Sequence, residues 1–355
     1  MVREAIDEVL EVAVKKNASD IHFMAGHSPS IRVNGEIQKL DEIQPLSPER
    51  INAMMESLLS EEQVNRFRKS NELDCSYNIP GISRFRANFH QSREGIGMSF
   101  RIISSTIPTP EELGLTESMT ALASLHNGLV LVTGPTGCGK TTTIACLLEL
   151  INQQLKGHIL TVEDPIEFIF EPKKCIITQR EVGIHTQTFA NAIKYGMRQD
   201  PDVILIGEMR DLETISMALT AAETGHLVFA TLHTNDAAKT IDRIVDVFPP
   251  YQQQQIRIQL ATTLRVVICQ VLIPKLDGKG RIASRELLIV NNPVSALIRE
   301  GKTHQIYNAI EMGLRAGMMP MDRSLANLVR KGEVSMEEAM AKSNNLQQFE
   351  SYLRV

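Results

Sequence analysis

Tryptophan is absent from this sequence, tyrosine occurs five times, and the formal net charge is −5. Proteins that hold nucleic acid strands need a basic surface and aromatic side chains that stack on bases, so this composition argues against a nucleic acid partner. The five cysteines are scattered without Cys-x-x-Cys spacing. That pattern argues against a disulfide framework or a zinc ribbon and fits a reducing cytoplasm.

Long apolar runs are missing as well. No stretch approaches the roughly 18 consecutive apolar residues expected of a membrane-spanning helix. The first residues, MVREAIDEVLEVAVKK, carry acidic side chains between the apolar ones and do not have the pattern of a signal peptide. We therefore expect a cytoplasmic protein without direct membrane insertion, and its 355 residues are enough for two domains.

Residues 1–103 have the pattern of a small α+β domain. Apolar residues from Ile6 to Ala13 recur at helical spacing, and Asn34-Gly35 suits the tight turn of a β-hairpin. Alternating runs that predict an antiparallel sheet follow at 75–79, 83–90 and 97–102. Residues 104–116 contain two prolines and small polar residues, which predicts a hinge linker.

The pattern changes over residues 117–355 to apolar strands that alternate with helices. Strands are predicted at 129–133, 159–162, 203–206 and 227–232, with helices at roughly 139–154, 188–199 and 211–223. Such alternation predicts an α/β domain with a largely parallel sheet covered on both faces. A hairpin-like pair at 266–273 and 282–290 precedes three or four C-terminal helices.

The strongest chemical signal is a phosphate-binding loop. Residues 134–141 match Gly-x-x-x-x-Gly-Lys-[Ser/Thr] between an apolar strand and a helix; they are Gly134, Pro135, Thr136, Gly137, Cys138, Gly139, Lys140 and Thr141. Glycines let backbone N–H groups turn toward phosphate oxygens, and the helix N-terminus favours an anion. Lys140 would bridge the β- and γ-phosphates, Thr141 would bind Mg²⁺, and Thr142 completes the nucleotide-binding stretch. The predicted cofactors are therefore ATP and Mg²⁺.

Two acidic residues end predicted buried strands. Glu208 closes the strand that begins at Asp200, where it could hold Mg²⁺ or orient the attacking water. Gly207 stands where such strands frequently have an aspartate. Glu163 ends another strand at the same edge of the sheet and could act as the general base. The alternative for Glu163 is a solvated acidic turn.

Two histidines, His226 and His233, bracket the strand at 227–232. They are seven residues apart, so alternation along a strand would point them to opposite faces. We expect at least one of them to lie near the nucleotide, and a purely structural role is the alternative. Metal binding is not expected, because no third ligand lies at a suitable spacing.

Taken in order, GPTGCGKT, TVEDPIEF, DPDVILIGEMRDLET and TAAETGHLVFATLHTN resemble the Walker A, Asp-box, Walker B and His-box motifs of the secretion ATPase superfamily. Within it, the chain is most similar to the PilT-type retraction motors of type IV pili. The resemblance implies a RecA-like ATPase domain behind a smaller PAS-like domain, and a homohexameric ring. It also implies that Glu163 and Glu208 are the catalytic and metal-linked acids, and that His226 and His233 are the His-box residues.

The resemblance further implies a place at the inner face of the cell membrane, with an inner-membrane pilus platform protein and paralogous pilus ATPases as partners. It places the N-terminal arginines of the family on Arg84, Arg86, Arg93 and Arg101. Arginines can stabilise the charge of a phosphoryl-transfer transition state, and we favour Arg84 and Arg101 for that role, with Arg86 as a nucleotide ligand. Plain solvated charge is the alternative.

The chain departs from the family at two places. Cys138 replaces a more usual serine, which would make the loop sensitive to oxidation if its thiolate were accessible. Residues 292–300, NPVSALIRE, lack the arginine of the Ala-Ile-Arg-Asn stretch found in retraction motors, which concerns the direction of work. The alternatives are an extension or secretion ATPase, a nucleic acid translocase, and a nucleotide-binding regulator of a paralogous ATPase. The extension and secretion enzymes usually carry a longer N-terminal region and a four-cysteine module, so retraction is favoured.

Overall fold

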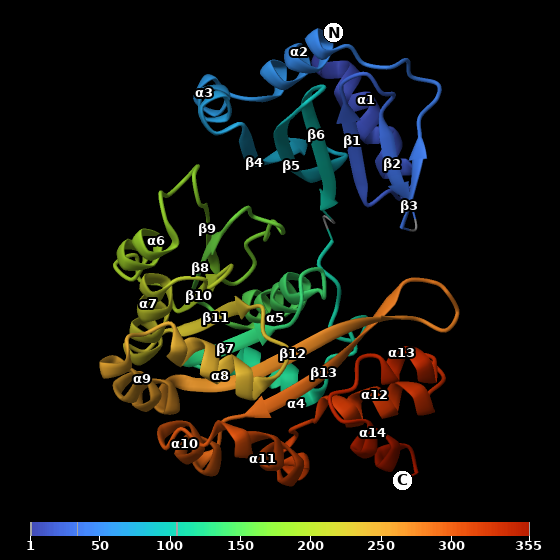
Figure 1. The fold of residues 1–355 in the computed structure, drawn as a ribbon. Helices are drawn as coiled ribbons and strands as arrows, with labels where there is room; N and C mark the ends of the chain where they lie inside the picture. Colours follow the sequence, from blue (N-terminus) through green and yellow to red (C-terminus); the bar gives the residue numbers. More distant parts are fainter. Residues whose placement is uncertain (1, 34, 104–105, 355) are drawn as a thin grey trace. The chain divides into compact units, whose positions relative to one another are not determined.

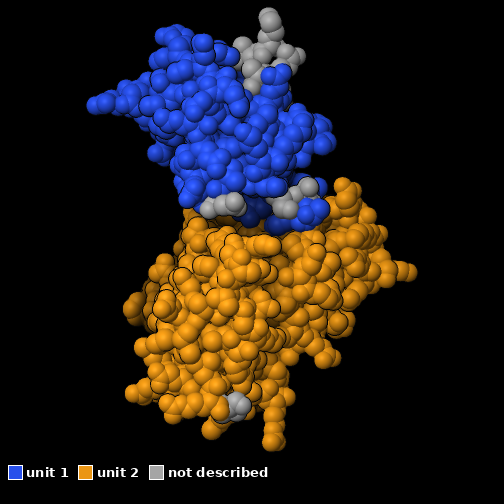
Figure 2. Space-filling view, turned by 90° about the vertical axis from the view of Figure 1, so that its right-hand side faces the viewer, with its two compact units in different colours: residues 1–106, 165–169 blue, residues 107–164, 170–355 orange. Residues whose placement is uncertain are grey.

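The computed structural model describes residues 2–33, 35–103 and 106–354 (Figure 1). The chain forms two compact units, coloured separately in Figure 2. The first comprises residues 1–106 and 165–169, and the second comprises residues 107–164 and 170–355. Each unit has a sheet and a hydrophobic core of its own.

The first unit is built on a six-stranded antiparallel sheet in the order β3-β2-β1-β6-β5-β4. Its strands are β1 (Asp20–Met24), β2 (Ser30–Val33), β3 (Glu36–Lys39), β4 (Glu72–Ile79), β5 (Ser83–Ser92) and β6 (Gly95–Ile103). The three predicted runs lie within β4, β5 and β6. Strands β2 and β3 form a hairpin in which Val33 is paired with Glu36. Asn34 of the predicted turn lies outside the described residues, as do residues 104 and 105 of the predicted linker.

Three helices complete the first unit: α1 (Val2–Lys15), α2 (Pro48–Leu58) and α3 (Glu61–Ser70). Helix α3 begins with a capping box, because the Ser60 side chain accepts a hydrogen bond from the Gln63 backbone while the Gln63 side chain accepts one from Ser60. In the core, Phe100 meets Phe23 and Phe85 in edge-to-face contacts. Strand alternation leaves a polar face on the other side of β5 and β6.

The second unit holds a seven-stranded sheet in the order β13-β12-β7-β11-β10-β8-β9. Its strands are β7 (Gly128–Thr133), β8 (His158–Glu163), β9 (Ile176–Glu181), β10 (Val203–Ile206), β11 (Leu227–Leu232), β12 (Leu264–Pro274) and β13 (Arg281–Ile289). All neighbours are parallel except β12 and β13, which form an antiparallel hairpin. The predicted fold class, an α/β domain preceded by a smaller α+β domain, is confirmed.

Helices surround this sheet. They are α4 (Glu117–Thr120), α5 (Lys140–Gln154), α6 (Phe189–Gly196), α7 (Leu212–Glu223), α8 (Ala237–Asp246), α9 (Pro250–Thr263), α10 (Asn292–Arg299), α11 (Ile306–Met312), α12 (Met321–Arg330), α13 (Met336–Met340) and α14 (Leu346–Leu353), with short 3₁₀ turns at Ala121–Ser124, Thr303–Gln305 and Leu314–Ala316. Residues of α6 to α9 share one core cluster with alternate residues of β7, β10 and β11. Helix α5 packs against β7 and β11 outside that cluster.

The C-terminal helices are fastened by a buried carboxylate. Asp322 is fully buried at the start of α12. It accepts hydrogen bonds from the Ser343 hydroxyl and the Asn344 backbone, both at 2.8 Å, and from the Asn345 backbone at 3.2 Å. These bonds tie the start of α14 to α12. Among the described residues, no helix combines the length and the apolar character needed to cross a membrane.

Candidate active site

The candidate site lies at one edge of the seven-stranded sheet. Strands β7, β11, β10 and β8 are parallel neighbours in that order, so their carboxyl ends meet at one edge. The loop 134–139 follows β7, His233 follows β11, Glu208 lies just beyond β10, and Glu163 ends β8. In open α/β sheets, ligands bind outside the carboxyl ends of the strands.

The loop itself depends on glycine. Gly134, Gly137 and Gly139 have φ angles of 140°, 75° and 86°, in the region that side chains disfavour. A Cβ atom at Gly134 would also lie 2.2 Å from the carbonyl oxygen of Gln270. The loop therefore passes directly against strand β12, at a place where only glycine fits.

Lys140 opens helix α5 and is only 8% exposed. Its Nζ donates to the carbonyl oxygens of Gly134 at 2.9 Å and Pro135 at 3.2 Å. The ammonium group thus lies inside the curve of the loop, beside the start of a helix, where an anion is favoured. Thr141 and Thr142 follow in the first turn of α5 and are half-buried.

The cysteine of the loop does not meet the condition for oxidation sensitivity. Cys138 is 3% exposed. Burial raises the pKa of its thiol above the ordinary value, although Lys140 acts in the opposite direction. Reactive cysteines are accessible and have lowered pKa values, so Cys138 belongs to the inert, structural kind.

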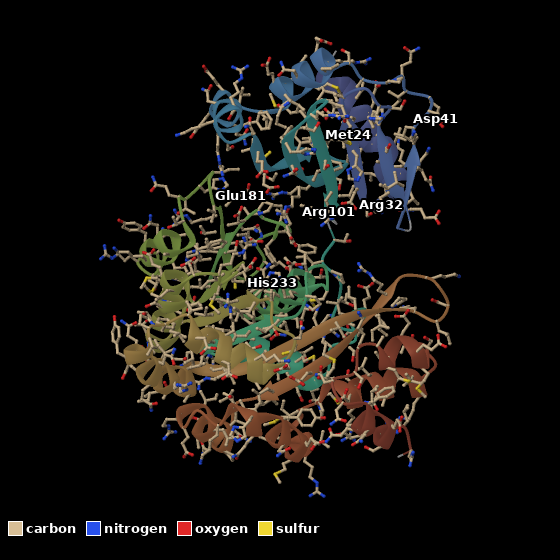
Figure 3. The ribbon with its side chains drawn as sticks, in the orientation of Figure 1. Met24, Arg32, Asp41, Arg101, Glu181 and His233 are labelled. Atoms are coloured by element: carbon tan, nitrogen blue, oxygen red, sulfur yellow. The ribbon has the colours of Figure 1, made fainter. Side chains whose placement is uncertain are left out.

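Glu208 is the centre of a chain of side-chain contacts. Arg210 donates to both carboxylate oxygens, from Nε at 2.5 Å and from its terminal nitrogen at 2.7 Å. His233 Nε2 lies 3.2 Å from the same carboxylate, and His233 Nδ1 lies 3.5 Å from the Thr136 hydroxyl. His233, labelled in Figure 3, therefore connects the phosphate loop to Glu208.

These contacts set the charge of Glu208. Burial alone would raise the pKa of its carboxyl, but the hydrogen bonds and positive charge of Arg210, with His233 in support, hold that pKa below the ordinary value. Glu208 is thus a carboxylate at neutral pH. Its oxygens are already hydrogen-bonded, which suits a contact with a cation through water rather than direct binding.

Glu163 is a buried carboxylate, 4% exposed, rather than part of a solvated turn. Thr161 Oγ1 donates to its Oε1 at 2.7 Å, and Gln179 Nε2 lies 3.5 Å from the same oxygen. Glu181 is paired with Glu163 at the end of the neighbouring strand β9 and is 2% exposed (Figure 3). Two buried carboxylates therefore lie side by side at this edge.

Gly207 lets the chain after β10 pass close to the end of β8. A Cβ atom at this position would lie 3.2 Å from both the Cα of Glu163 and the carbonyl oxygen of Val162. The Gly207 N–H donates to that same carbonyl oxygen at 2.8 Å. The aspartate frequent at this point of other proteins would therefore crowd Glu163.

His226 does not join the cluster. It precedes β11, at the amino end of that strand, where its Nδ1 lies 3.0 Å from the Ala221 carbonyl oxygen. His233 lies at the other end, so the strand separates the two histidines by about 20 Å. Strand length, rather than alternation of faces, distinguishes them, and His233 is the one that lies beside the phosphate loop.

The predicted arginines belong to the first unit. Arg86 and Arg101 are directly paired across β5 and β6, and Arg84 lies two residues from Arg86 on the same polar face. Arg101 donates from Nε to Asp20 at 2.8 Å and keeps 64% of its side chain exposed. Arg93 lies in the turn at the opposite end of these strands and pairs with Glu94 at 3.0 Å. Three arginines thus share one end of the sheet, and Arg93 is apart from them.

A cavity of about 550 Å³ adjoins the phosphate loop within the second unit. The loop and α5 contribute residues 138, 139, 142 and 143, the turn at 111–114 forms a second wall, and β12 and β13 form a third. Gln270 of β12, 1% exposed, links these walls. Its amide nitrogen donates to the Cys138 carbonyl oxygen at 2.5 Å, and its amide oxygen accepts from the Thr143 hydroxyl at 2.9 Å.

Several of these residues carried no sequence signal. Gln270 and Arg285 lie in a predicted hairpin, far beyond the loop in the sequence, so only the pairing of β12 with β7 and of β13 with β12 brings them near it. Glu181 ends an edge strand that was not predicted, because its exposed and half-buried residues form no apolar run. In the described part of the chain, no group of three or more His, Cys, Asp or Glu side chains is arranged to hold a metal.

A phosphate loop on a parallel sheet, followed by acids and a histidine at the neighbouring strand ends, defines a RecA-like P-loop nucleotide-binding protein. Residues 1–351 match the Type II/IV secretion system protein family, and the chain belongs to that family. The Type IV pilus retractation ATPase PilT of Pseudomonas aeruginosa is 47% identical over 338 residues, which cover 95% of this chain and 98% of that protein. The Type IV pilus ATPase PilU of the same organism is 39% identical over 340 residues, covering 96% and 88%.

Solved structures agree with this assignment. A crystal structure of the pilus retraction motor PilT with bound ADP superposes with a TM-score of 0.90 at 44% sequence identity, covering 97% of this chain and 98% of that one. The ATPase DotB of Legionella pneumophila follows with a TM-score of 0.80 at 28% identity, covering 96% and 95%. The smaller domain is thus the PAS-like domain that the family resemblance implied.

Proposed function

We propose that this protein is an ATP-hydrolysing motor that drives retraction of type IV pili. The observation that carries the proposal is the contact chain from Thr136 in the phosphate loop through His233 to Glu208. This series of side-chain contacts would connect the phosphates of a bound nucleotide to Glu208, a charged acid just beyond the end of β10. Similarity to PilT over nearly the whole length supports the direction of work.

The residues divide the chemistry among them. The loop N–H groups and Lys140 would bind the β- and γ-phosphates of ATP. Bound Mg²⁺ would neutralise phosphate charge, and the Thr141 hydroxyl with a water-linked Glu208 is the donor set that suits it. Glu163 would accept the proton of the attacking water, since a general base must reach that water directly or through one other.

The cavity beside the loop is the proposed place of the nucleoside. Thr142 contributes to it and follows the residues that would bind the phosphates. Its volume lies in the range of roughly 300–1,000 Å³ that ligand pockets occupy. Leu272 and Leu113 supply apolar walls for a flat base, and charged side chains surround them.

We also propose a homohexamer in which residues 1–103, the PAS-like domain, act through the hinge at 104–116 on the ATPase domain at 117–355. Arg84, Arg86 and Arg101 would then supply positive charge to a nucleotide, and a ring would make hydrolysis depend on assembly. The proposed place is the inner face of the cell membrane, beside a pilus platform protein and paralogous pilus ATPases.

Deletion of the gene with complementation tests the direction of work. Excess pili that do not retract are expected in the deletion strain, and the wild-type protein should restore retraction, whereas the Lys140→Ala variant should not. Loss of pili would instead indicate an extension motor, and unchanged pili would contradict a pilus function.

A further inference from the structure

Arg285 is a buried arginine that lines the cavity beside the phosphate loop. Its side chain is 5% exposed. Its Nε lies 3.3 Å from the amide oxygen of Gln270, and one terminal nitrogen donates to the Leu113 carbonyl oxygen at 2.8 Å. Both partners are neutral, and among the described residues no carboxylate lies within ion-pair distance of Arg285.

A buried charge without a carboxylate needs a reason. Buried charges are ordinarily paired, because the loss of hydration costs several kcal/mol. Burial does lower the pKa of Arg285, to about 10, but the guanidinium remains charged at neutral pH. A guanidinium has five N–H donors, and the two contacts above use only part of them.

The position of Arg285 is fixed from three sides. Its backbone is paired with Gln270 across the hairpin, and its backbone N–H donates to the Ser324 hydroxyl at 3.0 Å. The contact with Leu113 holds the turn that forms the opposite wall of the cavity. The remaining N–H donors of Arg285 therefore belong to a side chain that is held in one orientation. Such a group favours recognition of a ligand with hydrogen-bond acceptors.

Resting on the proposed function, we propose that Arg285 is a specificity residue that recognises the nucleoside part of the bound nucleotide. Its remaining N–H donors would meet acceptor atoms of a purine ring or ribose that enters the cavity. Purine nitrogens and ribose oxygens are acceptors of this kind, whereas the phosphates lie with the loop and Lys140. Arg285 therefore contributes to affinity for a nucleotide and not for a bare polyphosphate.

Arg285 could instead act only through Gln270, which holds the Cys138 carbonyl of the loop. The two roles are separated by comparing ADP with inorganic tripolyphosphate. Arg285→Met should weaken ADP binding by roughly 10-fold or more, the value of a hydrogen bond to a charged group. Tripolyphosphate should bind as it does to the wild-type protein. Titration calorimetry measures the affinity for ADP, and competition against ADP measures the affinity for tripolyphosphate.

Arg265→Met is the matched control. Arg265 lies in the same hairpin, near the start of β12, and is also held by neutral oxygens, at Asn127 and Thr262. This variant should bind both ligands as the wild-type protein does. Equal losses of ADP and tripolyphosphate in Arg285→Met would overturn the proposal, as would unchanged ADP affinity.

A measurement on the wild-type protein covers the case of a variant that does not fold. ADP should slow hydrogen exchange in the turn 109–115, which Arg285 holds at Leu113, and tripolyphosphate should not. Equal protection by the two ligands, or none by ADP, would contradict the proposal. Phosphate release from ATP by the wild-type protein tests the proposed function separately, because it does not depend on how Arg285 contributes.

Discussion

His233 Nε2 lies 3.2 Å from the carboxylate of Glu208, across the neighbouring strands β11 and β10. The second ring nitrogen of His233 lies 3.5 Å from the Thr136 hydroxyl. One imidazole thus contacts both the loop that would hold phosphate and the acid proposed to bind Mg²⁺ through water. A change at the phosphate end would alter the partner of His233, and with it the charge balance at Glu208.

Lys140→Ala should reduce ATP hydrolysis by roughly 100-fold or more, because loss of one group that stabilises transition-state charge has effects of that size. Phosphate release at saturating ATP measures it. Lys156→Ala, an exposed lysine near the other end of α5, is the control and should retain wild-type turnover. Undiminished turnover in Lys140→Ala would refute the assignment of the site.

Glu208→Gln should separate binding from hydrolysis. The variant keeps the size of the side chain but removes the charge that Arg210 and His233 stabilise. We expect nucleotide binding close to that of the wild-type protein and a loss of turnover of about 100-fold. Binding is measured by calorimetry and turnover by phosphate release. Parallel loss of both would mean that Glu208 has a structural role only.

Gly207→Ala should damage the site through crowding. The added Cβ would lie 3.2 Å from the Cα of Glu163, so one of the two strand ends must shift. We expect a loss of about 1–3 kcal/mol in the free energy of unfolding, together with reduced turnover. Gly207 is not among the glycines with a positive φ angle, so crowding rather than backbone strain accounts for the expected loss.

Glu286 should make stability depend on pH. Burial raises the pKa of its carboxyl from 4.5 to about 7, although it accepts a hydrogen bond from the Ala237 backbone at 2.9 Å. Between these pH values the unfolded chain releases the proton while the folded chain keeps it, so stability falls as the pH rises. The loss amounts to about 3 kcal/mol above pH 7.

Glu286→Gln removes that ionisation. Relative to the wild-type protein, the variant should therefore gain about 3 kcal/mol in the free energy of unfolding between pH 4.5 and pH 7.5. Urea denaturation at a series of pH values measures the difference between the two proteins. A difference that stays constant across this range would show that Glu286 does not titrate as described.

Asp322→Ala should loosen the C-terminal helices. It leaves the Ser343 hydroxyl and the Asn344 and Asn345 N–H groups without their buried acceptor. We expect a loss of about 2–4 kcal/mol in the free energy of unfolding, measured by urea denaturation. Asp246→Ala, an exposed residue at the end of α8, should change it little.

The sequence predicted those parts of the site that are local in the chain. The loop 134–141, the strand before it and helix α5 each have their own pattern, and Glu163 and Glu208 end apolar runs. Strands β10 and β11 have the predicted bounds. Parallel strands bring their carboxyl ends to one edge, so that part of the geometry followed from the alternation of strands and helices.

The sequence did not predict contacts between residues that lie far apart along the chain. Arg285 and Gln270 meet the loop only through the register of β13 on β12 and of β12 on β7. Arg210 follows Glu208 by two residues but shows no pattern that predicts a bidentate contact. For the histidines, the six residues of β11 between them are visible in the sequence, and the length of that strand, not the alternation of its faces, separates them.

Gly134 packs so closely against the Gln270 carbonyl that the phosphate loop and the β12–β13 hairpin form one structural unit. A designer who moved residues 134–141 alone onto another parallel sheet would lose the surface that shapes the loop. The same restriction applies to evolution, because a substitution that changes the path of β12 must be accompanied by a compensating change in the loop. Variation in related chains should therefore accumulate at 276–280, in the turn of the hairpin, beyond the part of β12 that meets the loop.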